Sequence, residues 1–275
     1  MLINNKKFDF KNKTYTMGIL NLTPDSFSDG GSYADVEEAI KRAKKMVEEG
    51  ADIIDVGAES TRPGATYIEE DEELERILPV IKRLVTEVDV PISIDTYKSR
   101  VAEECIKVGA HIINDIKGLK EDPNMAKVVA KYGVSIIIMH IQGNPKNMQK
   151  KPIYDNMIED IKESLRESVE IAIEAGISPK NIILDPGIGF GKTFQGNLEI
   201  IKKLCEFKKL EYPILMGASR KGFIGEILGT PPLDRLEGNL AVAVISAYNG
   251  ASIIRVHEVK ETVKALKVTD SIKNN

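Results

Sequence analysis

Long apolar runs, a cysteine framework and clusters of positive charge are all missing from this 275-residue chain. No apolar run approaches the ~18 residues of a membrane-spanning helix, and the N-terminus lacks the apolar core of a secretory signal. The two cysteines, Cys105 and Cys205, each lie in a helical pattern, which predicts free thiols in a reducing cytoplasm. A net charge of -4, with lysines interleaved among glutamates, argues against a nucleic-acid or membrane-surface partner.

Several catalytic motifs are absent as well. The segment 181–192, N-I-I-L-D-P-G-I-G-F-G-K, is rich in glycine, but Pro186 stands where a phosphate-binding loop requires glycine. Only Phe190 separates its last two glycines, whereas a dinucleotide fingerprint requires two residues there. Ser219, in G-A-S-R-K, is not in a nucleophile elbow, and no Cys-x-x-Cys or His-x-Glu spacing indicates a tight zinc or iron site.

Short apolar runs alternate along the chain with amphipathic stretches, which is typical of a parallel sheet covered by helices. The apolar runs occupy 16–20, 53–56, 92–94, 111–113, 134–139, 182–184, 213–216 and 253–254. The helical patterns occupy 35–49, 70–87, 98–108, 123–131, 155–175, 198–207, 222–228, 232–248 and 258–266. Eight such units favour an α/β fold, a closed (β/α)8 TIM barrel, over an open doubly wound sheet. We expect one domain over 1–275, with a short N-terminal β-hairpin in 1–15, the barrel in 16–266 and a tail in 267–275.

Polar side chains follow these runs at the carboxyl ends of the predicted strands, where barrel enzymes carry their active sites. They are Asn21, Asp95, Asn114, Asp185, Lys221, Arg255 and His257. Carboxylates and an amide suit the N–H edge of a heterocycle, and cationic side chains, with Arg62 among them, suit an oligophosphate. The residues alone therefore predict an enzyme whose N-heterocyclic substrate carries phosphate, with Asn21 and the phosphates holding a loosely bound Mg²⁺.

Each of these residues also has a simpler structural interpretation. A single Asp95 at a strand end is usually a helix N-cap, and Asp115 and Asp122 fit caps or turns. For His140, a structural role is as well supported as a catalytic one. The functional hypothesis therefore depends on all the polar residues converging at the carboxyl ends of the strands, which form the mouth of the barrel.

Eight segments follow one another in the order of a known family. They are M-G-I-L-N-L-T-P-D-S-F-S-D-G-G (17–31), D-V-G-A-E-S-T-R-P-G (55–64), S-I-D-T (93–96), G-A-H-I-I-N-D-I (109–116), M-H-I-Q-G-N-P-K-N-M-Q (139–149), L-D-P-G-I-G-F-G-K (184–192), G-A-S-R-K (217–221) and I-I-R-V-H-E-V-K-E-T (253–262). On these segments the chain resembles the dihydropteroate synthases, pterin-binding TIM-barrel enzymes of folate biosynthesis. The resemblance implies a cytoplasmic, Mg²⁺-dependent homodimer, targeted by sulfonamides. Its reaction would join 6-hydroxymethyl-7,8-dihydropterin pyrophosphate to p-aminobenzoate, giving 7,8-dihydropteroate and pyrophosphate by a dissociative displacement under mobile loops.

The resemblance also implies roles for individual residues. Pterin binding falls to Asp95, Asn114, Asp185, Lys221, Met139 and Phe190. The pyrophosphate site comprises Asn21, Thr61, Arg62, Arg255 and His257, with Asn21 also at the metal. The p-aminobenzoate site comprises Thr61, Pro63, Phe190 and Lys221. Catalytic roles fall to Asp95, Lys221, Arg62 and Thr61.

Two departures from the family pattern and two rival interpretations accompany the resemblance. Ala58 stands where glycine is common, and Gly222 stands where some members have a serine that would contact the p-aminobenzoate carboxylate. One rival is a pterin-binding methyltransferase domain, which needs neither the S-T-R-P-G loop (60–64) nor the R-V-H segment (255–257) and works with a corrinoid partner. The other is a non-enzymatic binding protein or a degenerate paralogue.

Overall fold

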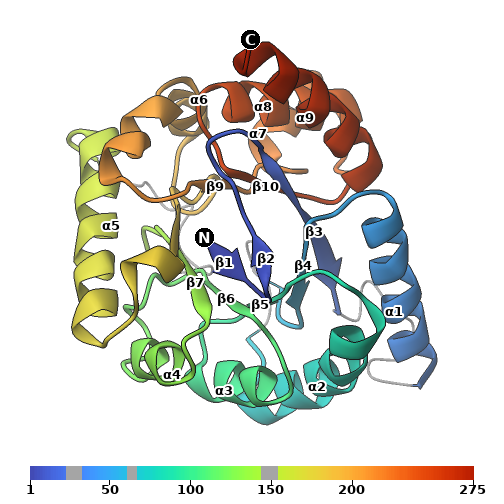
Figure 1. Cartoon of the computed structure of the whole chain (residues 1–275). Helices are drawn as coiled ribbons and strands as arrows, with labels where there is room; N and C mark the ends of the chain where they lie inside the picture. Colours follow the sequence, from blue (N-terminus) through green and yellow to red (C-terminus); the bar gives the residue numbers. More distant parts are fainter. Residues whose placement is uncertain (23–32, 61–66, 144–153) are drawn as a thin grey trace.

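Parallel strands form a ring that helices surround on the outside (Figure 1). The computed structural model describes residues 1–22, 33–60, 67–143 and 154–275. The strands of the ring are β3 (Tyr15–Asn21), β4 (Ile53–Gly57), β5 (Ile92–Asp95), β6 (Ile112–Asp115), β7 (Ser135–Met139), β8 (Ile182–Asp185), β9 (Leu215–Met216) and β10 (Ile253–Val256). They pair in the order β8-β7-β6-β5-β4-β3-β10-β9. A parallel bridge between Leu184 and Ile214 brings the two ends of this order together, so the predicted barrel is confirmed.

The helices of the outer layer follow the strands in turn. They are α1 (Tyr33–Glu48), α2 (Glu70–Glu87), α3 (Ser99–Lys107), α4 (Met125–Tyr132), α5 (Met157–Glu174), α6 (Phe194–Lys202), α7 (Gly222–Leu228), α8 (Leu236–Tyr248) and α9 (Val259–Lys273). Two short 3-10 helices, at Pro179–Asn181 and Leu204–Leu210, complete the set in the described residues. Helices α2 and α7 have the bounds that the sequence pattern predicts.

The prediction of a single helix over 198–207 is wrong. Helix α6 begins earlier, at Phe194, because the Thr193 hydroxyl accepts a hydrogen bond from the Gly196 N–H at 3.0 Å and so caps the helix. The chain after Lys202 tightens into the 3-10 helix Leu204–Leu210, so the expected helix is two elements in succession.

The last two helices also differ from expectation at their ends. Helix α8 begins at Leu236 instead of 232, because the preceding residues form a turn in which the Asp234 N–H bonds the Pro231 carbonyl at 3.0 Å. Helix α9 runs to Lys273, so most of the expected tail at 267–275 is helical. Its Asp270 carboxylate accepts both the N–H and the hydroxyl of Thr14, at 2.8 and 2.7 Å, which ties the end of the chain to its beginning.

An antiparallel hairpin lies across the amino-terminal end of the barrel (Figure 1). Its strands, β1 (Leu2–Ile3) and β2 (Lys6–Lys7), are joined through Asn4 and Asn5, whose positive φ angles of 48° and 56° suit a two-residue turn. Below the hairpin, inward-facing strand side chains form one apolar cluster with residues of the N-terminal segment. Its buried members are Ile3, Phe8, Tyr15, Met17, Ile53, Ile112, Ile137, Ile183, Leu215 and Ile253. Within the described residues the cluster fills the barrel floor, so a site inside the barrel would lie toward the carboxyl ends of the strands.

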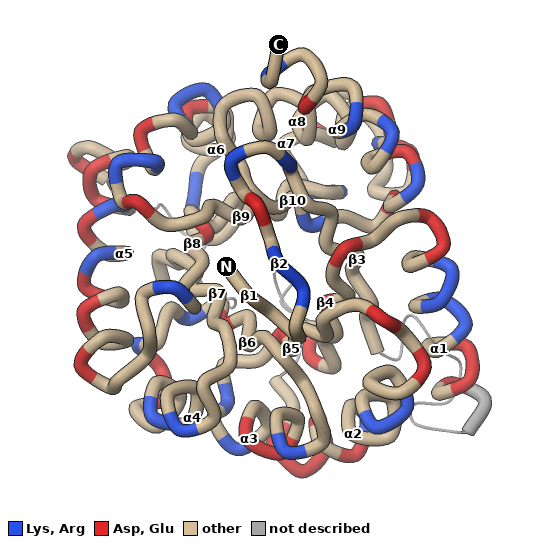
Figure 2. Tube along the Cα trace, viewed as in Figure 1, with Lys and Arg blue, Asp and Glu red and all other residues tan. Residues whose placement is uncertain are grey.

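The outer surface of the helices carries charges of both signs in close alternation (Figure 2). The sequence predicted this interleaving, and it gives the mixed surface of an ordinary globular domain. Among the described residues, no helix combines the length and the apolar character needed to cross a bilayer.

Candidate active site

Polar side chains replace apolar ones in the inward-facing layer above the barrel floor. Because side chains alternate along a strand, Asp55 lies above Ile53 and Arg255 lies above Ile253 on the inner side. Strand register sets their neighbours, since Asp95 pairs with Asn114 across β5 and β6. Asp55 is fully buried and Asn114 is 3% exposed, so these groups are largely withdrawn from water.

An arginine joins two carboxylates at the centre of this layer. The Arg255 Nε donates to Asp55 Oδ2 at 2.6 Å, and its Nη2 donates to Asp95 Oδ2 at 2.7 Å. The Asn114 Nδ2 donates to the same Asp55 oxygen at 3.1 Å. Four side chains from β4, β5, β6 and β10 thereby form one hydrogen-bonded group, although Arg255 is 200 residues from Asp55 in sequence.

Asp55 is a residue that the sequence interpretation missed. It lies inside the run I-I-D-V-G, which reads as the interior of a strand. One signal was available: the Asp55 carboxylate lies on the same strand face as Ile53 and Gly57. A buried charge in an apolar run requires a partner, so this position predicts a polar site inside the barrel. Its second oxygen, Oδ1, is buried and has no hydrogen-bond partner among the described residues.

The burial of these groups changes their protonation. Burial raises the pKa of Asp95 to about 7, with Arg255 opposing the rise and Asp55 adding to it. Burial likewise raises the pKa of Asp185 to about 6, against the Gly187 N–H that its carboxylate accepts at 2.7 Å. For Arg255 burial acts to lower the pKa, but the two carboxylates outweigh it and the pKa rises.

Asp185 ends β8 and begins a loop whose glycines pack against the end of β7. Gly187 has a φ of 72°, and a Cβ there would lie 1.9 Å from the His140 carbonyl oxygen, so only glycine fits. Lys192, which closes this loop, is 4% exposed and reaches back to His140, with its Nζ 2.8 Å from Nδ1 and 3.0 Å from the carbonyl oxygen.

The sequence supported a structural and a catalytic role for His140 equally, and these contacts favour the structural role. Burial, followed by the positive charge of Lys192, lowers the pKa of His140 to about 2, so the ring is neutral. Burial also lowers the pKa of Lys192 well below its usual range, so the two nitrogens share one buried hydrogen bond. Lys192 was not singled out from sequence, although its position directly after the glycine segment was a usable signal.

Lys221 reaches the site from a strained turn after β9. Arg220 has a positive φ of 61°, and its Nε donates to Glu258 Oε1 at 2.7 Å, which holds the turn in place. The Lys221 Nζ lies 3.9 Å from the centre of the Phe190 ring. Burial and the charge of Arg255 lower the pKa of Lys221 to about 8, while Asp185 and Asp95 act in the other direction.

The remaining predicted residues lie around the same mouth. Asn21 ends β3, pairs with Gly57 of β4 and is half-buried. The His257 Nδ1 lies 2.9 Å from the Ser219 hydroxyl, which fixes the ring beside the Lys221 turn. Met139 ends β7 opposite Asp185 and forms a buried apolar cluster with Phe190 and Ile116.

Three predicted residues fall on a part of the chain that the structure does not describe. Thr61, Arg62 and Pro63 lie outside the described residues. Ala58, the first departure from the family pattern, is fully buried at the end of β4. Gly222, the second, begins α7 directly after Lys221.

The two aspartates with structural interpretations behave as turn formers. Asp115 accepts the N–H groups of Lys117 and Leu119, both at 2.8 Å. Asp122 accepts the N–H of Ser99 at 2.8 Å and the N–H of Asn124 at 2.9 Å. Both predictions of a cap or turn are confirmed.

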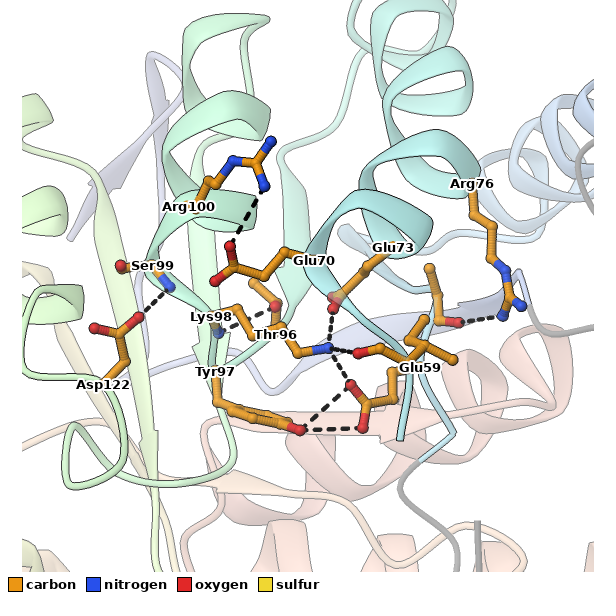
Figure 3. A network of polar contacts seen from close by, with 12 residues as sticks. Glu59, Glu70, Glu73, Arg76, Thr96, Tyr97, Lys98, Ser99, Arg100 and Asp122 are labelled. Carbon is orange, nitrogen blue, oxygen red and sulfur yellow. Dashed lines mark hydrogen bonds and ion pairs between the residues drawn. The ribbon is translucent and has the colours of Figure 1, made fainter. Parts of the chain in front are cut away.

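A second polar cluster lies beside the mouth (Figure 3). The Lys98 ammonium is 2.5 Å from Glu59 Oε2 and 2.7 Å from Glu73 Oε2, and it donates to the Ile68 carbonyl at 2.7 Å. The side chain of Lys98 is 5% exposed, and its place in the helical pattern 98–108 did not indicate these partners. Sequence reasoning missed this cluster.

Comparison with known proteins identifies similar chains over nearly the full length. The family model described as pterin binding enzyme matches residues 17–257. A dihydropteroate synthase from Clostridium beijerinckii is 50% identical over 273 residues, with 99% of each chain covered. A dihydropteroate synthase structure from Clostridium difficile, determined in the presence of pteroic acid, has a TM-score of 0.93 at 49% identity and covers 98% of this chain and 100% of that one. A sulfonamide complex of the Yersinia pestis enzyme has a TM-score of 0.95 at 43% identity, with coverages of 100% and 99%.

Proposed function

The chain belongs to the dihydropteroate synthase family of pterin-binding enzymes, and from that membership we propose how its barrel mouth performs the reaction. The pterin ring of 6-hydroxymethyl-7,8-dihydropterin pyrophosphate binds among the buried polar groups. Its pyrophosphate lies nearer the rim, and p-aminobenzoate binds above the pterin. The observation that carries this proposal is the buried polar layer at the carboxyl ends of the strands, above a floor formed by a buried apolar cluster.

In this proposal the pterin is recognised by acceptors for its ring N–H groups. Asp95 and Asp185 supply carboxylate oxygens, and Asn114 supplies its amide oxygen, because its Nδ2 is already donated to Asp55. Met139 and Phe190 line the flat faces of the ring, which their position in one buried apolar cluster supports. Asp55 belongs to the same site, since its unpartnered Oδ1 is a further buried acceptor.

The pyrophosphate is assigned to Asn21, Arg255 and His257, with Thr61 and Arg62 added on the resemblance alone. Arg255 remains cationic, but its Nε and Nη2 are bonded to Asp55 and Asp95. Its other N–H groups are the ones that would meet a phosphate oxygen. Arg255 would therefore link the ring site to the phosphate site.

Mg²⁺ is proposed as the ion that accompanies the pyrophosphate. Within residues 1–22, 33–60, 67–143 and 154–275, no three His, Cys, Asp or Glu side chains gather into a metal site. The amide oxygen of Asn21 is a hard ligand that suits an ion held mainly by substrate oxygens and water, so the residues fit a loosely bound Mg²⁺. When bound, the ion supplies positive charge to the departing pyrophosphate.

We assign the chemical step to electrostatic stabilisation in a dissociative displacement. The bond between the pterin methylene and the pyrophosphate oxygen breaks, and its electron pair leaves with the pyrophosphate. The ionised Asp95 and Asp185 stabilise the resulting cation, and Arg255 and His257 stabilise the leaving group. The amine of p-aminobenzoate then forms the new C–N bond and loses a proton. Lys221, with its pKa of about 8, lies between the carboxylates and the Phe190 side of the p-aminobenzoate site, which also includes Pro63 by resemblance.

A homodimer and a cytoplasmic location complete the proposal. Exposed apolar side chains gather on α7, α8, α9 and the loop before α8: Ile227, Leu228, Leu233, Ile245, Tyr248, Val268 and Ile272. Such a patch on neighbouring helices suits a self-complementary interface. Leu233→Glu, at a residue that is 82% exposed, is expected to give monomers in sedimentation velocity. The free Cys105 and Cys205 suit the reducing cytoplasm.

The test is an assay of pyrophosphate release with each substrate alone and with both together. The proposal requires release that depends on both the pterin pyrophosphate and p-aminobenzoate. Repeated turnover without p-aminobenzoate, beyond the single release per site that a dissociative step permits, would contradict it, and so would tight pterin binding with no release under any condition.

A further inference from the structure

Tyr97 lies at the mouth of the barrel, one step further out than Asp95. The Thr96 N–H still bonds the Asn114 carbonyl at 3.2 Å, so the pairing of β5 with β6 continues past the end of the strand. Because side chains alternate along an extended chain, Tyr97 is on the same side as Asp95 and nearer the rim. A side chain at this level lies above the ring site, where the second substrate is proposed to bind.

The ring of Tyr97 packs on the apolar wall of the site. Tyr97 and Ile141 both pack against the buried cluster formed by Ile116, Met139 and Phe190. In that cluster, the Phe190 ring has the Lys221 ammonium 3.9 Å from its centre. Tyr97 therefore extends the wall from the pterin level toward solvent.

The hydroxyl of Tyr97 is fixed by the second polar cluster (Figure 3). It lies 3.1 and 3.3 Å from the two oxygens of Glu59, and Glu59 is itself bonded to Lys98 at 2.5 Å. Lys98 is anchored in turn by Glu73 of α2 and by the Ile68 carbonyl, both at 2.7 Å. Lys98 thus holds Glu59 in one place, and Glu59 holds the tyrosine ring in one orientation.

We propose that Tyr97 is a further substrate-contacting residue, whose ring contacts the flat aromatic amine that accepts the pterin group, and that Lys98 is its positioning residue. This inference rests on the proposed function, in which the acceptor binds above the pterin. It gives the Lys98–Glu59 pair a role in acceptor affinity that is separate from pterin recognition on β5, β6 and β8.

The first test compares Tyr97→Ala with Tyr97→Phe. Loss of the ring is expected to raise the KM for p-aminobenzoate about tenfold, as removal of one aromatic contact does. Loss of the hydroxyl alone is expected to raise it about threefold, because the ring remains but is no longer held by Glu59. In both variants the Kd for a bare pterin, measured by calorimetric titration, should stay within about twofold of the wild type.

The second test addresses Lys98 with a matched control. Lys98→Met should reproduce the Tyr97→Phe effect on the KM for p-aminobenzoate, and the double variant should be no worse than either single one, since both act through Glu59. If Lys98→Met does not fold, the double variant Lys98→Met/Glu73→Gln replaces it in this test. The second substitution neutralises one of the two carboxylates that the loss of Lys98 leaves unpaired. Lys162→Met is the control, because Lys162 is also a buried lysine, 3% exposed and paired with Glu159 on α5, outside this cluster.

The outcomes separate this inference from the proposed function. A wild-type enzyme that fails to release pyrophosphate with both substrates would refute the proposed function. An active wild type whose Tyr97 and Lys98 variants keep the wild-type KM for p-aminobenzoate would refute only the present inference. A parallel loss of pterin affinity in these variants, or an equal effect of Lys162→Met, would overturn it as well, because the role would then be general stability.

Discussion

Asp55→Asn is expected to move the acidic limit of pterin binding to lower pH. The substitution keeps the shape of the side chain and an oxygen for Arg255 Nε, which donates to Asp55 Oδ2 at 2.6 Å. Its other oxygen becomes an amide nitrogen, which weakens pterin binding at every pH but does not by itself move the acidic limit. The substitution removes the negative charge that, after burial and the opposing effect of Arg255, raises the pKa of Asp95. Since Asp95 must be ionised to accept the pterin N–H groups, affinity is lost as the pH falls through its pKa of about 7. Without the Asp55 charge ionisation is easier, and the loss begins at a lower pH.

The size of the shift follows from the geometry of the guanidinium. The two carboxylates bind different nitrogens of Arg255, which places their charges about 5 Å apart. Two unit charges at this distance repel by roughly 3 kcal/mol at an effective dielectric constant of about 20. The mouth is open to water and the side chain of Arg255 is 20% exposed, so screening reduces this value. We expect a shift of about one pH unit, equivalent to about 1.4 kcal/mol.

The measurement is the Kd of a bare pterin by calorimetry between about pH 5 and pH 9, for the wild type and the variant. The pterin's own titration is common to both proteins and cancels in their difference. Asp115→Asn is the control, because Asp115 is also buried, with a pKa raised by burial to about 6, but faces the outer side of β6. An unmoved limit in Asp55→Asn, a limit moved to higher pH, or an equal shift in the control would refute the reasoning.

Three further predictions concern neighbouring residues. Asp185→Asn should weaken pterin binding at least about tenfold in the same titration, because an amide donor then faces ring N–H groups; unchanged affinity would remove Asp185 from the pterin site. His257→Ala should lower the rate of pyrophosphate release while the Kd of a bare pterin changes by less than about twofold, and a matching loss of pterin affinity would contradict the assignment to pyrophosphate. Lys192→Met should lower the free energy of unfolding in urea by about 2–4 kcal/mol, because His140 Nδ1 and its carbonyl lose a buried donor; a loss below about 0.5 kcal/mol would contradict this.

The barrel and much of its mouth could be predicted because their signals are local. An apolar run that ends in Asp95, Asn114 or Asp185 specifies both a buried strand and a polar side chain at its carboxyl end. The order of the strands then follows from short connections between neighbours. Helix ends were less predictable, because caps and turns such as Thr193 and the residues before α8 act through single hydrogen bonds.

What could not be predicted is the pairing of charges that are distant in sequence. Arg255 was expected at a phosphate near the rim, but two of its nitrogens bond carboxylates inside the barrel. Lys98 begins a predicted helix, and its buried ammonium is paired with Glu59 and Glu73, which meet it from other elements. Neither partnership has a pattern within a window of one helix or strand, so three-dimensional closure of the barrel is needed to reveal it.

In the part of the chain that the structure describes, the hairpin and the apolar floor close the amino-terminal end of the barrel. With Phe8 and Ile3 packed into the floor, a molecule bound deep in the barrel leaves past whatever is bound nearer the carboxyl ends of the strands. With the pterin bound below p-aminobenzoate, as proposed above, the pterin has to enter first and the joined product has to leave by the same route. A compound bound above the pterin would block its dissociation. The residence time of that compound would then set how long the pterin stays bound.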